Sequence, residues 1–598
     1  MLQHLFTLDD DGATSLQRQL QRKLIESILS GYFSRGSKMP SSRKLAEQLQ
    51  VSRNTVVAAY EQLIEEGYLV SRERSGIYVN DKIYDDHATT DAPPTPDTPQ
   101  YDWQQRFNSL NVEASEPPYP DDWQRYAYPF IDGQYDQSLF PLNQWRECSR
   151  LCLNVDEIKS WAGDSGQQDD PNLIHEIRTK VLPRRGIMAQ PDEILVTLGS
   201  QQALYLLSRL LMNSSTLLTM EEPGYQGMRQ LAQINLCPTR YAEVEKDGVK
   251  LEDVCPQTDL LYVTPSHQVP TAVTMSRQKR EALVEKARQE DFVIIEDDYE
   301  SEANFISNPN PALKSLDGEG RVVYISSFSK VLAPGLRLGF MVASPELIKK
   351  ARQLRSLILR HPPANNQRIM ALFLSLGYYD MTMRRLHQAI NARWQELREA
   401  LNHYLGPYIL TSETMGGSTC WVKGPPGLDS RHFAEQAAEK GILIEPVERF
   451  YARTEKARGF FRLGVRSIPK DKIRPGIQEL AKLIDDVEAR EDATFGEHLQ
   501  GDKLKLFLAG VQFSGTTVFG DPYRITLDAD GSMQGFEGHR DEKQDAGTWW
   551  LKDDTWYRQW QNWSYGELLG FDVYITDTRI HWVRDGKLVD AADYQKLG

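Results

Sequence analysis

Apolar positions near the start of the chain recur with the period of short helices and then of short strands. Leucine and isoleucine fall every three to four residues over 15–29, which predicts an amphipathic helix. A second helix is predicted to begin at 40–42, and a third to run over 53–64. Two short apolar runs, 67–70 and 76–79, follow as strands around a basic tip. The pattern therefore predicts a compact N-terminal unit of three helices and a strand pair.

This order of elements is the plan of a winged helix-turn-helix, whose last helix enters the major groove of DNA. Residues 13–79 carry 10 Lys and Arg against 6 Asp and Glu, whereas the whole chain carries 69 against 84. A basic module in an acidic chain is expected where one part alone meets DNA, although a small helical dimerisation domain would share the periodicity. We therefore expect residues 1–82 to bind a double-stranded DNA operator. The candidate contacts start the second and third helices or form the basic tip: Ser42, Arg43, Ser52, Arg53, Asn54, Thr55, Arg72 and Arg74.

Two apolar strands in the middle of the chain lead into residues that share one chemistry. One run, 293–299, ends in a carboxylate at Asp297; another, 321–330, delivers Lys330 into a small-residue turn, with Arg337 seven residues on. Such a lysine can be held as an imine with an aldehyde cofactor, while the carboxylate pairs with a pyridinium nitrogen. Either run alone is more simply a solvated loop or a strand cap. The two in this order, 33 residues apart, indicate a cofactor site.

Over roughly residues 125–485 the chain resembles fold type I pyridoxal-phosphate (PLP) enzymes, the aspartate aminotransferase-like group. Besides the two runs above, four further runs carry the resemblance, at 198–204, 221–225, 264–268 and 461–464. The resemblance implies a multidomain α/β chain in which a PLP-dependent transferase fold has a large α/β/α sandwich domain and a small α/β domain. It also implies pyridoxal 5′-phosphate as the cofactor.

The resemblance gives a role to each residue that matches these motifs. Lys330 would form the Schiff base, Asp297 would pair with the ring nitrogen, and Tyr299 would hydrogen-bond the phenolic oxygen. Tyr225 would stack on the ring, and Arg462 would hold the carboxylate of an amino acid, because a planar guanidinium matches carboxylate geometry. The phosphate would lie at a helix start, among Ser200, Gln201, Ser327 and Arg337.

Two stretches depart from the pattern of these enzymes. The enzymes usually carry Asn-Pro-Thr-Gly where this chain reads Val269-Pro270-Thr271-Ala272, so an amide donor is missing and alanine replaces glycine. Residues 161–171 include extra positions where the enzymes keep a compact turn. We expect these changes to spare cofactor binding and to weaken turnover.

The N-terminal motifs resemble the GntR family of bacterial repressors, and the combination with an aminotransferase-like body resembles the MocR subfamily of transcription regulators. The residues that carry this second likeness are 40–46, 51–56, 67–69, 130–141 and 264–268. It implies a regulator that senses a small amino-compound effector through the Lys330 Schiff base, as a homodimer. An active PLP-dependent aminotransferase (transaminase) with an appended DNA-binding domain stays open as the alternative. A third interpretation is a body that only dimerises. The set of pocket residues that match the family argues against it.

The remaining segments differ in composition. Residues 83–122 are rich in proline and polar residues near their start, which predicts a linker before a PLP-binding body at 123–488. Residues 489–598 contain six of the twelve tryptophans in short alternating runs, which predict about seven antiparallel strands in a small barrel or sandwich. Their 12 Lys and Arg against 19 Asp and Glu argue against a second DNA site. Their aromatic residues are expected in the core, with a ligand pocket as the alternative.

The sequence also bears on where the protein acts. No run of about 18 apolar residues occurs, so we expect no membrane-spanning helix. The first ten residues are acidic where a secretion signal would be basic. Five cysteines without CxxC spacing suit a reducing compartment and offer no metal site. We therefore expect a cytoplasmic protein without a bound metal.

Overall fold

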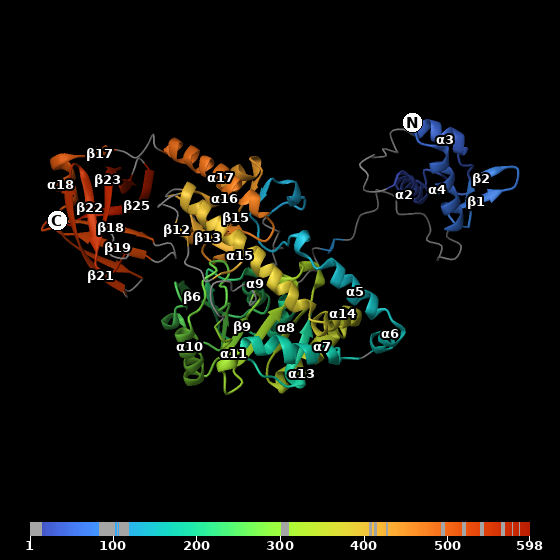
Figure 1. Cartoon of the computed structure of the whole chain (residues 1–598), viewed down its shortest axis with the longest axis horizontal. Coiled ribbons are helices and arrows are strands. Elements are labelled where there is room, and N and C mark those ends of the chain that lie inside the picture. The colour runs from blue at the N-terminus through green and yellow to red at the C-terminus, as the bar shows by residue number, and fades with distance from the viewer. Residues whose placement is uncertain are drawn as a thin grey trace. The chain divides into compact units, whose positions relative to one another are not determined.

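The chain forms two compact units, Met1–Ser109 and Leu110–Gly598, each described here by itself (Figure 1). The linker expected at 83–122 lies largely outside the described residues. The computed structural model describes residues 15–82, 102–103, 106, 119–164, 166–300, 310–405, 410–411, 416–425, 428–457, 459–491, 497–516, 522–538, 543–563, 568–576, 578–584 and 587–597.

The first unit contains the three helices and the strand pair that the sequence predicts. These are α2 (Leu16–Leu29), α3 (Ser42–Leu49), α4 (Arg53–Glu65), β1 (Leu69–Arg72) and β2 (Gly76–Val79). Each helix begins behind a serine, since the hydroxyls of Ser15, Ser41 and Ser52 accept a backbone N–H from the first turn. Apolar side chains of all five elements close one buried core. The winged helix-turn-helix prediction is confirmed.

The second unit is built on a mixed sheet, whose eight strands within the described ranges lie in the order β4-β11-β10-β9-β8-β5-β6-β7. Strands β6, β5, β8, β9 and β10 run parallel, and β11 is antiparallel to its neighbours β10 and β4. The carboxyl ends of β4, β5, β8, β9 and β10 therefore meet at one edge. The bounds are β4 (Ile194–Thr197), β5 (Leu218–Glu222), β6 (Thr239–Glu245), β7 (Gly248–Val249), β8 (Leu260–Val263), β9 (Val293–Asp297), β10 (Val322–Ser327) and β11 (Gly339–Val342).

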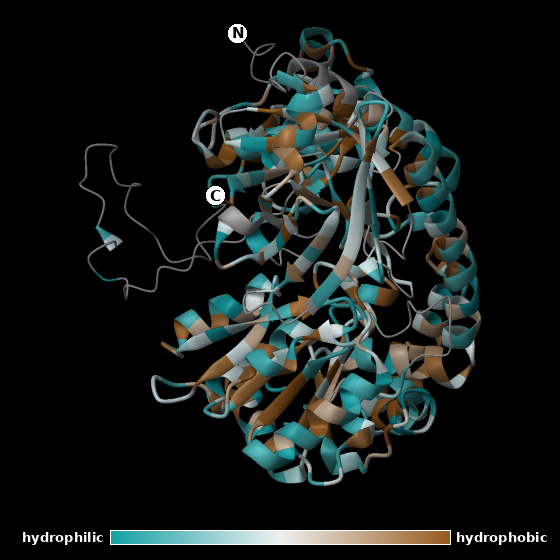
Figure 2. Ribbon diagram, turned by 90° about the vertical axis from the view of Figure 1, so that its left-hand side faces the viewer, coloured by the Kyte–Doolittle hydropathy of each residue, from teal (hydrophilic) through white to brown (hydrophobic). Residues whose placement is uncertain are grey.

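Helices cover both faces of this sheet, because alternate residues of each strand point in opposite directions. Tyr324 of β10 packs with α7 (Pro171–Glu176) and α14 (Ala364–Ser375), on the face that α10 (Arg277–Glu290) also covers. Its neighbour Ile325 packs with α8 (Ser200–Leu211), α9 (Gln226–Ile234) and α13 (Pro345–Leu359). In Figure 2 hydrophobic residues (brown) concentrate on strands and inner helix sides, with hydrophilic residues (teal) outside. The α/β/α sandwich prediction is confirmed.

A smaller α/β domain follows in the chain. Its sheet has the order β12-β13-β16-β15, with β12 (Leu410–Thr411), β13 (Thr419–Lys423), β15 (Glu445–Pro446) and β16 (Phe460–Gly464). Separately, β14 (Ile442–Leu443) pairs in parallel with β3 (Tyr128–Pro129), which ties an early segment to this domain. Three helices pack on the sheet to close a core, namely α15 (Tyr378–Tyr404), α16 (Ser430–Glu439) and α17 (Lys470–Glu491).

The last part of the chain is a closed barrel. Strands β18 to β25 each pair with the next in antiparallel fashion, and β18 also pairs with β25, so the ring has no free edge. A short strand, β17 (Glu497–Leu499), adds to one end of β23. The bounds are β18 (Val511–Thr516), β19 (Pro522–Leu527), β20 (Ser532–Glu537), β21 (Lys543–Lys552), β22 (Thr555–Trp560), β23 (Leu568–Ile575), β24 (Arg579–Arg584) and β25 (Lys587–Lys596).

The structure decides between the two predicted β architectures in favour of an up-and-down barrel. It also shows a limit of the strand pattern: Phe507 and Leu508, apolar residues that suit a short strand, end a helix, α18 (Gly501–Leu508). The apolar spacing of that helix, with Leu504, Phe507 and Leu508 buried, brings three side chains onto the barrel core. No helix of the described residues combines the length and apolar character that a bilayer crossing requires.

Candidate functional site

The carboxyl edge of the large sheet holds the predicted cofactor residues. Asp297 ends β9, and Ser327 ends β10 just before the short helix α12 (Phe328–Val331), which carries Lys330. The strand β4 leads through Gly199 into the start of α8. Ligands of open α/β sheets bind at such an edge, because the loops that leave the strands converge there.

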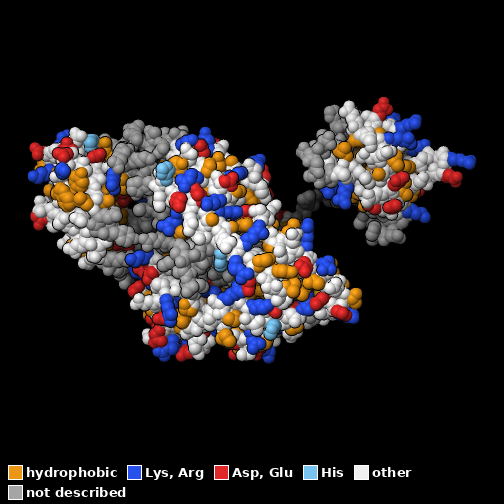
Figure 3. Space-filling model, viewed as in Figure 1, with side chains coloured by type: hydrophobic (Ala, Val, Ile, Leu, Met, Phe, Trp, Pro, Cys, Tyr) orange, Lys and Arg blue, Asp and Glu red, His pale blue; other side chains and the backbone are white. Residues whose placement is uncertain are grey.

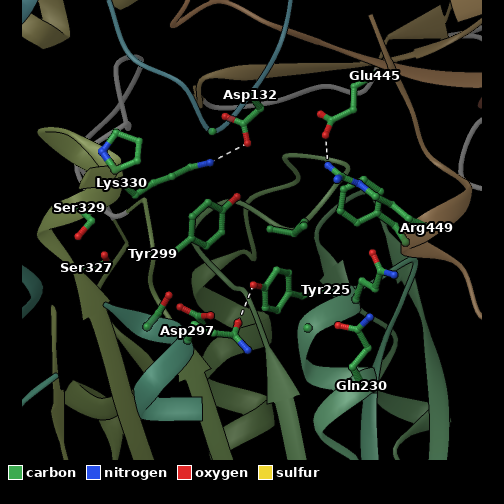
Figure 4. A pocket seen from close by; sticks show the side chains of 18 of the residues that line it. Asp132, Tyr225, Gln230, Asp297, Tyr299, Ser327, Ser329, Lys330, Glu445 and Arg449 are labelled. Atoms are coloured by element: carbon green, nitrogen blue, oxygen red, sulfur yellow. Dashed lines mark hydrogen bonds and ion pairs between the residues drawn. The ribbon is translucent and has the colours of Figure 1, made fainter. Parts of the chain in front are cut away.

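A cavity of about 590 Å³ opens at this edge (Figure 4). It brings together residues that are up to 343 positions apart in the chain, from Tyr119 to Arg462. All nine residues expected to bind cofactor or substrate line it: Ser200, Gln201, Tyr225, Asp297, Tyr299, Ser327, Lys330, Arg337 and Arg462.

Asp297 presents an unsatisfied carboxylate oxygen at the floor of the cavity. Its side chain is buried, with Oδ2 accepting from the Tyr262 hydroxyl at 3.0 Å while Oδ1 has no partner among the described residues. Burial raises the pKa of Asp297 to about 7, against the Tyr262 hydrogen bond and with help from the neighbouring Asp298 charge. A buried oxygen of this kind calls for a donor, and a cationic N–H suits it best.

A second group of residues forms a cradle for an anion. Gly199 has φ of 78°, and a Cβ there would lie 3.5 Å from the Arg337 guanidinium. A Cβ on Gly339 would lie 2.9 Å from the Gly199 Cα, so both glycines keep this corner open. Ser329, which the sequence analysis did not single out, joins Ser200 and the other cavity hydroxyls here. With the N-terminus of α8, these donors suit a phosphate.

Lys330 points across the cavity toward a carboxylate from another part of the chain (Figure 4). Its Nζ donates to Asp132 Oδ2 at 2.7 Å and lies 5.6 Å above the Tyr299 ring. Although burial opposes the charged form, the Lys330 ammonium and the Arg462 guanidinium hold the pKa of Asp132 well below its usual range. Asp132 therefore acts as an acceptor for an ammonium group at this point.

The opposite wall joins two arginines through one acid. Arg462 donates to Glu445 from Nε at 2.6 Å and lies 3.4 Å from Asp132. Arg449 also pairs with Glu445, as the dashed line in Figure 4 marks. Burial, together with the neighbouring Arg462, lowers the pKa of Arg449 to about 10. The predicted carboxylate receptor Arg462 is thus already paired, so an anionic ligand has to compete with Glu445.

Tyr225 lies beside the anion cradle. Its hydroxyl donates to Gln201 Oε1 at 2.8 Å, and burial raises its pKa to about 12. The two predicted residues therefore hold each other in place on the cavity wall. Tyr299 enters from the loop after β9, and burial raises its pKa well above the usual value. Both phenols are therefore neutral hydrogen-bond donors near pH 7.

The segment that departs from the enzyme pattern also meets the cavity. Val269 lines it and has no side-chain donor. The preceding Gln268 is buried, where its amide donates to the Pro223 and Val269 carbonyls and its oxygen accepts from Thr271. Ala272 has φ of 60°, a conformation that favours glycine. The turn at 268–272 is thus held by the Gln268 side chain, with alanine in the conformation that favours glycine.

Three charged residues of the cavity escaped the sequence analysis: Asp132, Glu445 and Arg449. Asp132 and Lys330 are 198 positions apart, and no local pattern links them. A signal existed for Asp132, since it falls in the stretch 130–141 on which part of the resemblance rests. Glu445 and Arg449 are four residues apart beside a buried strand, a placement in which charges usually have a partner.

The predicted DNA contacts lie at the surface of the first unit. Six of them are exposed, while Ser42 and Thr55 are half-buried. Ser52 and Thr55 share a hydrogen bond of 2.8 Å, so their hydroxyls serve the start of α4. Arg72 lies 4.6 Å over the Tyr78 ring and pairs with Asp81 at 3.5 Å. Figure 3 shows Lys and Arg side chains (blue) beside α3 and at the tip of this pair.

Two families match the chain. The family "Aminotransferase class I and II" matches residues 134–480, and the gntR family of bacterial regulatory proteins matches residues 16–79. The structure is similar to Pyrococcus horikoshii kynurenine aminotransferase, solved in complex with PMP, with a TM-score of 0.60 and 26% identity. That similarity covers 64% of this chain and 98% of the other. The α-aminoadipate aminotransferase LysN of Thermus thermophilus, complexed with N-(5′-phosphopyridoxyl)-L-leucine, has a TM-score of 0.59 at 25% identity, covering 65% and 100%.

Two regulators resemble the chain across both parts. It is 38% identical to the HTH-type transcriptional regulator TauR of Rhodobacter capsulatus, over 80% of this chain and 98% of TauR. It is 30% identical to the probable rhizopine catabolism regulatory protein MocR of Rhizobium meliloti, over 80% of this chain and 95% of that protein. The chain therefore belongs to the MocR-type regulators of the GntR family, in which a helix-turn-helix transcription regulator carries an aminotransferase class I and II domain.

Proposed function

We propose that the protein is a PLP-dependent transcription regulator that senses an amino compound at Lys330 and responds through its DNA-binding unit. The observation that carries this proposal is the convergence of Lys330, the unsatisfied Asp297 carboxylate and the anion cradle on one cavity. Pyridoxal phosphate would supply an aldehyde that forms a Schiff base with the Lys330 amine and that an effector amine can take over.

The residues of the cavity fit this cofactor. Asp297 Oδ1 is positioned to accept the N–H of a pyridinium ring, and a bound cation would keep this carboxyl ionised at neutral pH. Arg337 and Ser327 would hold the phosphate together with Ser200, Gln201 and Ser329 near the start of α8. Tyr299 would donate to the phenolic oxygen, and Tyr225 would lie against the ring.

Asp132 extends the proposal to the amine of the effector. In the absence of cofactor it accepts from the Lys330 ammonium at 2.7 Å. A Schiff base at Lys330 would remove that ammonium, and Asp132 would keep Arg462 at 3.4 Å and the Ser418 hydroxyl, which donates to its Oδ1 at 3.4 Å. Asp132 lines the same cavity as Lys330, so its carboxylate could accept from the ammonium group of an effector. We infer that Asp132 orients the effector amine.

The paired arginines extend the proposal to the other end of the effector. Arg462 and Arg449 both donate to Glu445, so an acidic group on the effector would replace Glu445 on at least one of them. Glu445 lies on β15, which pairs with the strand that carries Arg462, so its displacement would act directly on this sheet. We infer that the effector is an amino acid or an analogous amino compound with an anionic end.

The remaining partners follow from the DNA-binding unit. We propose that residues exposed at the start of α4 read an operator, and that a homodimer presents two such units to two half-sites. As a DNA-binding regulator of a bacterial family, the protein would act in the cytoplasm. An effector that binds one of two arrangements of the body more tightly would shift operator affinity by its differential affinity.

The test is a titration of the full-length protein loaded with PLP. A visible absorbance band typical of a lysine Schiff base is expected, and Lys330→Ala should abolish it. A panel of amino acids, aminosulfonates and diamines is then screened for a shift of the band and for a change in affinity for a selected DNA operator. Lys349→Ala, on the exposed side of α13, is a matched control that should leave both signals unchanged.

Two results would contradict the proposal. A band that persists in Lys330→Ala would place the cofactor on another amine. A band that shifts with an amino compound while operator affinity stays constant would separate the cavity from regulation.

Aminotransferase activity is the second candidate, favoured by the family match and by the complete set of cavity residues. We infer that it is weak, because Val269 provides no amide donor beside the ring. Amino acids supplied with pyruvate or 2-oxoglutarate should give single half-reactions. Steady turnover over many cycles would favour the enzyme over the sensor.

A further inference from the structure

A half-buried arginine, Arg558, lies in the wall of the C-terminal barrel. On β22 the side chains of Trp556 and Trp560 are buried, so Arg558 between them points to the same inner side of the barrel wall. The Arg558 Cζ atom lies 4.9 Å from the Phe571 ring centroid and 5.4 Å from those of Trp556 and Trp582. Three aromatic rings therefore surround one guanidinium.

This guanidinium has no counter-ion in the part of the chain that the structure describes. No carboxylate lies within ion-pair distance of it there, and its enclosed Nε has no hydrogen-bond acceptor. Burial lowers the pKa of Arg558, opposed by Tyr523 and Asp590. Asp590 instead accepts from the Tyr523 hydroxyl at 3.1 Å. A buried charge is rarely left without a partner, because its desolvation costs several kcal/mol.

Two indoles in the same cluster also lack a hydrogen-bond acceptor. Trp556 and Trp582, with ring centroids 6.0 Å apart, are fully buried, and neither Nε1 has an acceptor among the described residues. With Arg558, all three unsatisfied groups are donors. Water could serve any one of them, but a cluster of donors around a positive charge matches a ligand that brings acceptors and a negative charge.

We propose that the barrel is a second ligand site, which binds a small organic carboxylate through Arg558. The guanidinium matches a carboxylate in geometry and charge. The fully buried rings of Phe513, Trp556 and Trp582, whose centroids lie 5.6 to 6.0 Å apart in T-shaped and tilted pairs, make the surroundings of the guanidinium apolar. The interior of an eight-stranded barrel has room for one small molecule at most.

The charges around Arg558 favour a monoanion over phosphate. Arg558 is the one cationic side chain in the ring of aromatic residues described above, and Asp590 beside Tyr523 adds a negative charge nearby. One carboxylate balances the charge of Arg558 itself, whereas a dianion would exceed it and would be repelled more strongly by Asp590. This inference is independent of the cavity at Lys330 and of PLP.

The test uses the full-length protein saturated with PLP and three probes: acetate, octanoate and 4-fluorobenzoate. We expect saturable one-to-one binding of at least one of them by calorimetry, with 4-fluorobenzoate also followed by fluorine NMR. Arg558→Met should weaken the binding at least about tenfold, as expected for loss of a charge-assisted hydrogen bond. Arg524→Met, an exposed arginine on the same barrel, should bind as the unchanged protein does.

Two further measurements exclude a merely structural role. The neutral amide 4-fluorobenzamide should bind at least about tenfold more weakly than the benzoate, because it brings no charge. Without ligand, Arg558→Met should unfold at the same or a higher temperature, since methionine removes an uncompensated buried charge. Equal binding by Arg558→Met, equal binding of the amide, or no saturable binding of any carboxylate would overturn the proposal. So would a large loss of thermal stability in ligand-free Arg558→Met.

Discussion

Single carboxylates determine how the cavity at Lys330 is charged. Asp297 and Glu221 are both buried, and burial raises the pKa of each to about 7, whereas cationic neighbours keep Asp132 ionised. Asp297, which is predicted to face the ring nitrogen, therefore has a pKa near neutral pH and is partly protonated until a cation binds beside it. The acid that faces the lysine is already charged.

The first prediction concerns the pH dependence of stability. Because the pKa of Asp297 rises from about 4 unfolded to about 7 folded, folding takes up a proton, and stability falls as pH rises through this window. Asparagine stays neutral, so the stability of cofactor-free Asp297→Asn relative to the unchanged protein should improve by about 2–3 kcal/mol between pH 5 and pH 8. Calorimetric unfolding at both values measures this. A constant difference would mean that Asp297 is ionised in the folded protein throughout.

The second prediction concerns Glu445, the acid that joins Arg449 and Arg462. Glu445→Gln should destabilise the ligand-free protein by about 3 kcal/mol, because a buried guanidinium loses its counter-ion. The same change should tighten binding of an anionic amino compound, which no longer has to displace a carboxylate. Thermal unfolding with and without effector checks both effects. Weaker effector binding in this variant would mean that Glu445 contacts the effector directly.

At the scale of the element, the sequence predicts well those helices, strands and turns that are determined by neighbouring residues. The serine caps of α2, α3 and α4 and the continuous apolar runs of β9 and β10 lie within a few residues of the structure they specify. The turn at 528–531 is equally local, since it ends in Gly531, whose φ is 88°.

Pairings between distant segments could not be predicted from the sequence. β25 meets β18 after about 80 residues, and Asp132 meets Lys330 after 198. Neither contact produces a periodic pattern in the sequence, because each depends on how the whole sheet curves or packs. The helix α18 is a similar case. Its apolar residues would also suit a strand, and their place in the barrel core depends on distant strands.

The third prediction tests the start of α4. Ser52→Ala should lower the stability of the first unit by about 1 kcal/mol, because the backbone N–H of Thr55 loses its acceptor. Ser52→Asp keeps an acceptor at this position and should retain stability, yet its charge should repel DNA phosphates and weaken operator binding. Thermal unfolding and a gel shift separate the two roles. Normal operator affinity in Ser52→Asp would remove the start of α4 from the DNA interface.

At the scale of the whole molecule, sensing requires that two sites on one chain share free energy. The fourth prediction is reciprocity: the factor by which an effector changes operator affinity must equal the factor by which operator DNA changes effector affinity. Fluorescence anisotropy of labelled DNA gives the first factor, and the cofactor absorbance band gives the second. Lys330→Ala should bring both factors to one. Unequal factors would mean that the effector acts through another process, such as a change of oligomeric state.

The closure of the barrel also fixes where the polypeptide enters and leaves it. The Leu597 N–H donates to the Gly510 carbonyl at 2.9 Å, so the first and last residues of the ring adjoin each other. A segment with neighbouring ends can be grafted or circularly permuted without crossing its own strands. Joining 597 to 510 by a short glycine bridge, with fresh termini at the 528–531 turn, should leave the same tryptophan-lined shell intact.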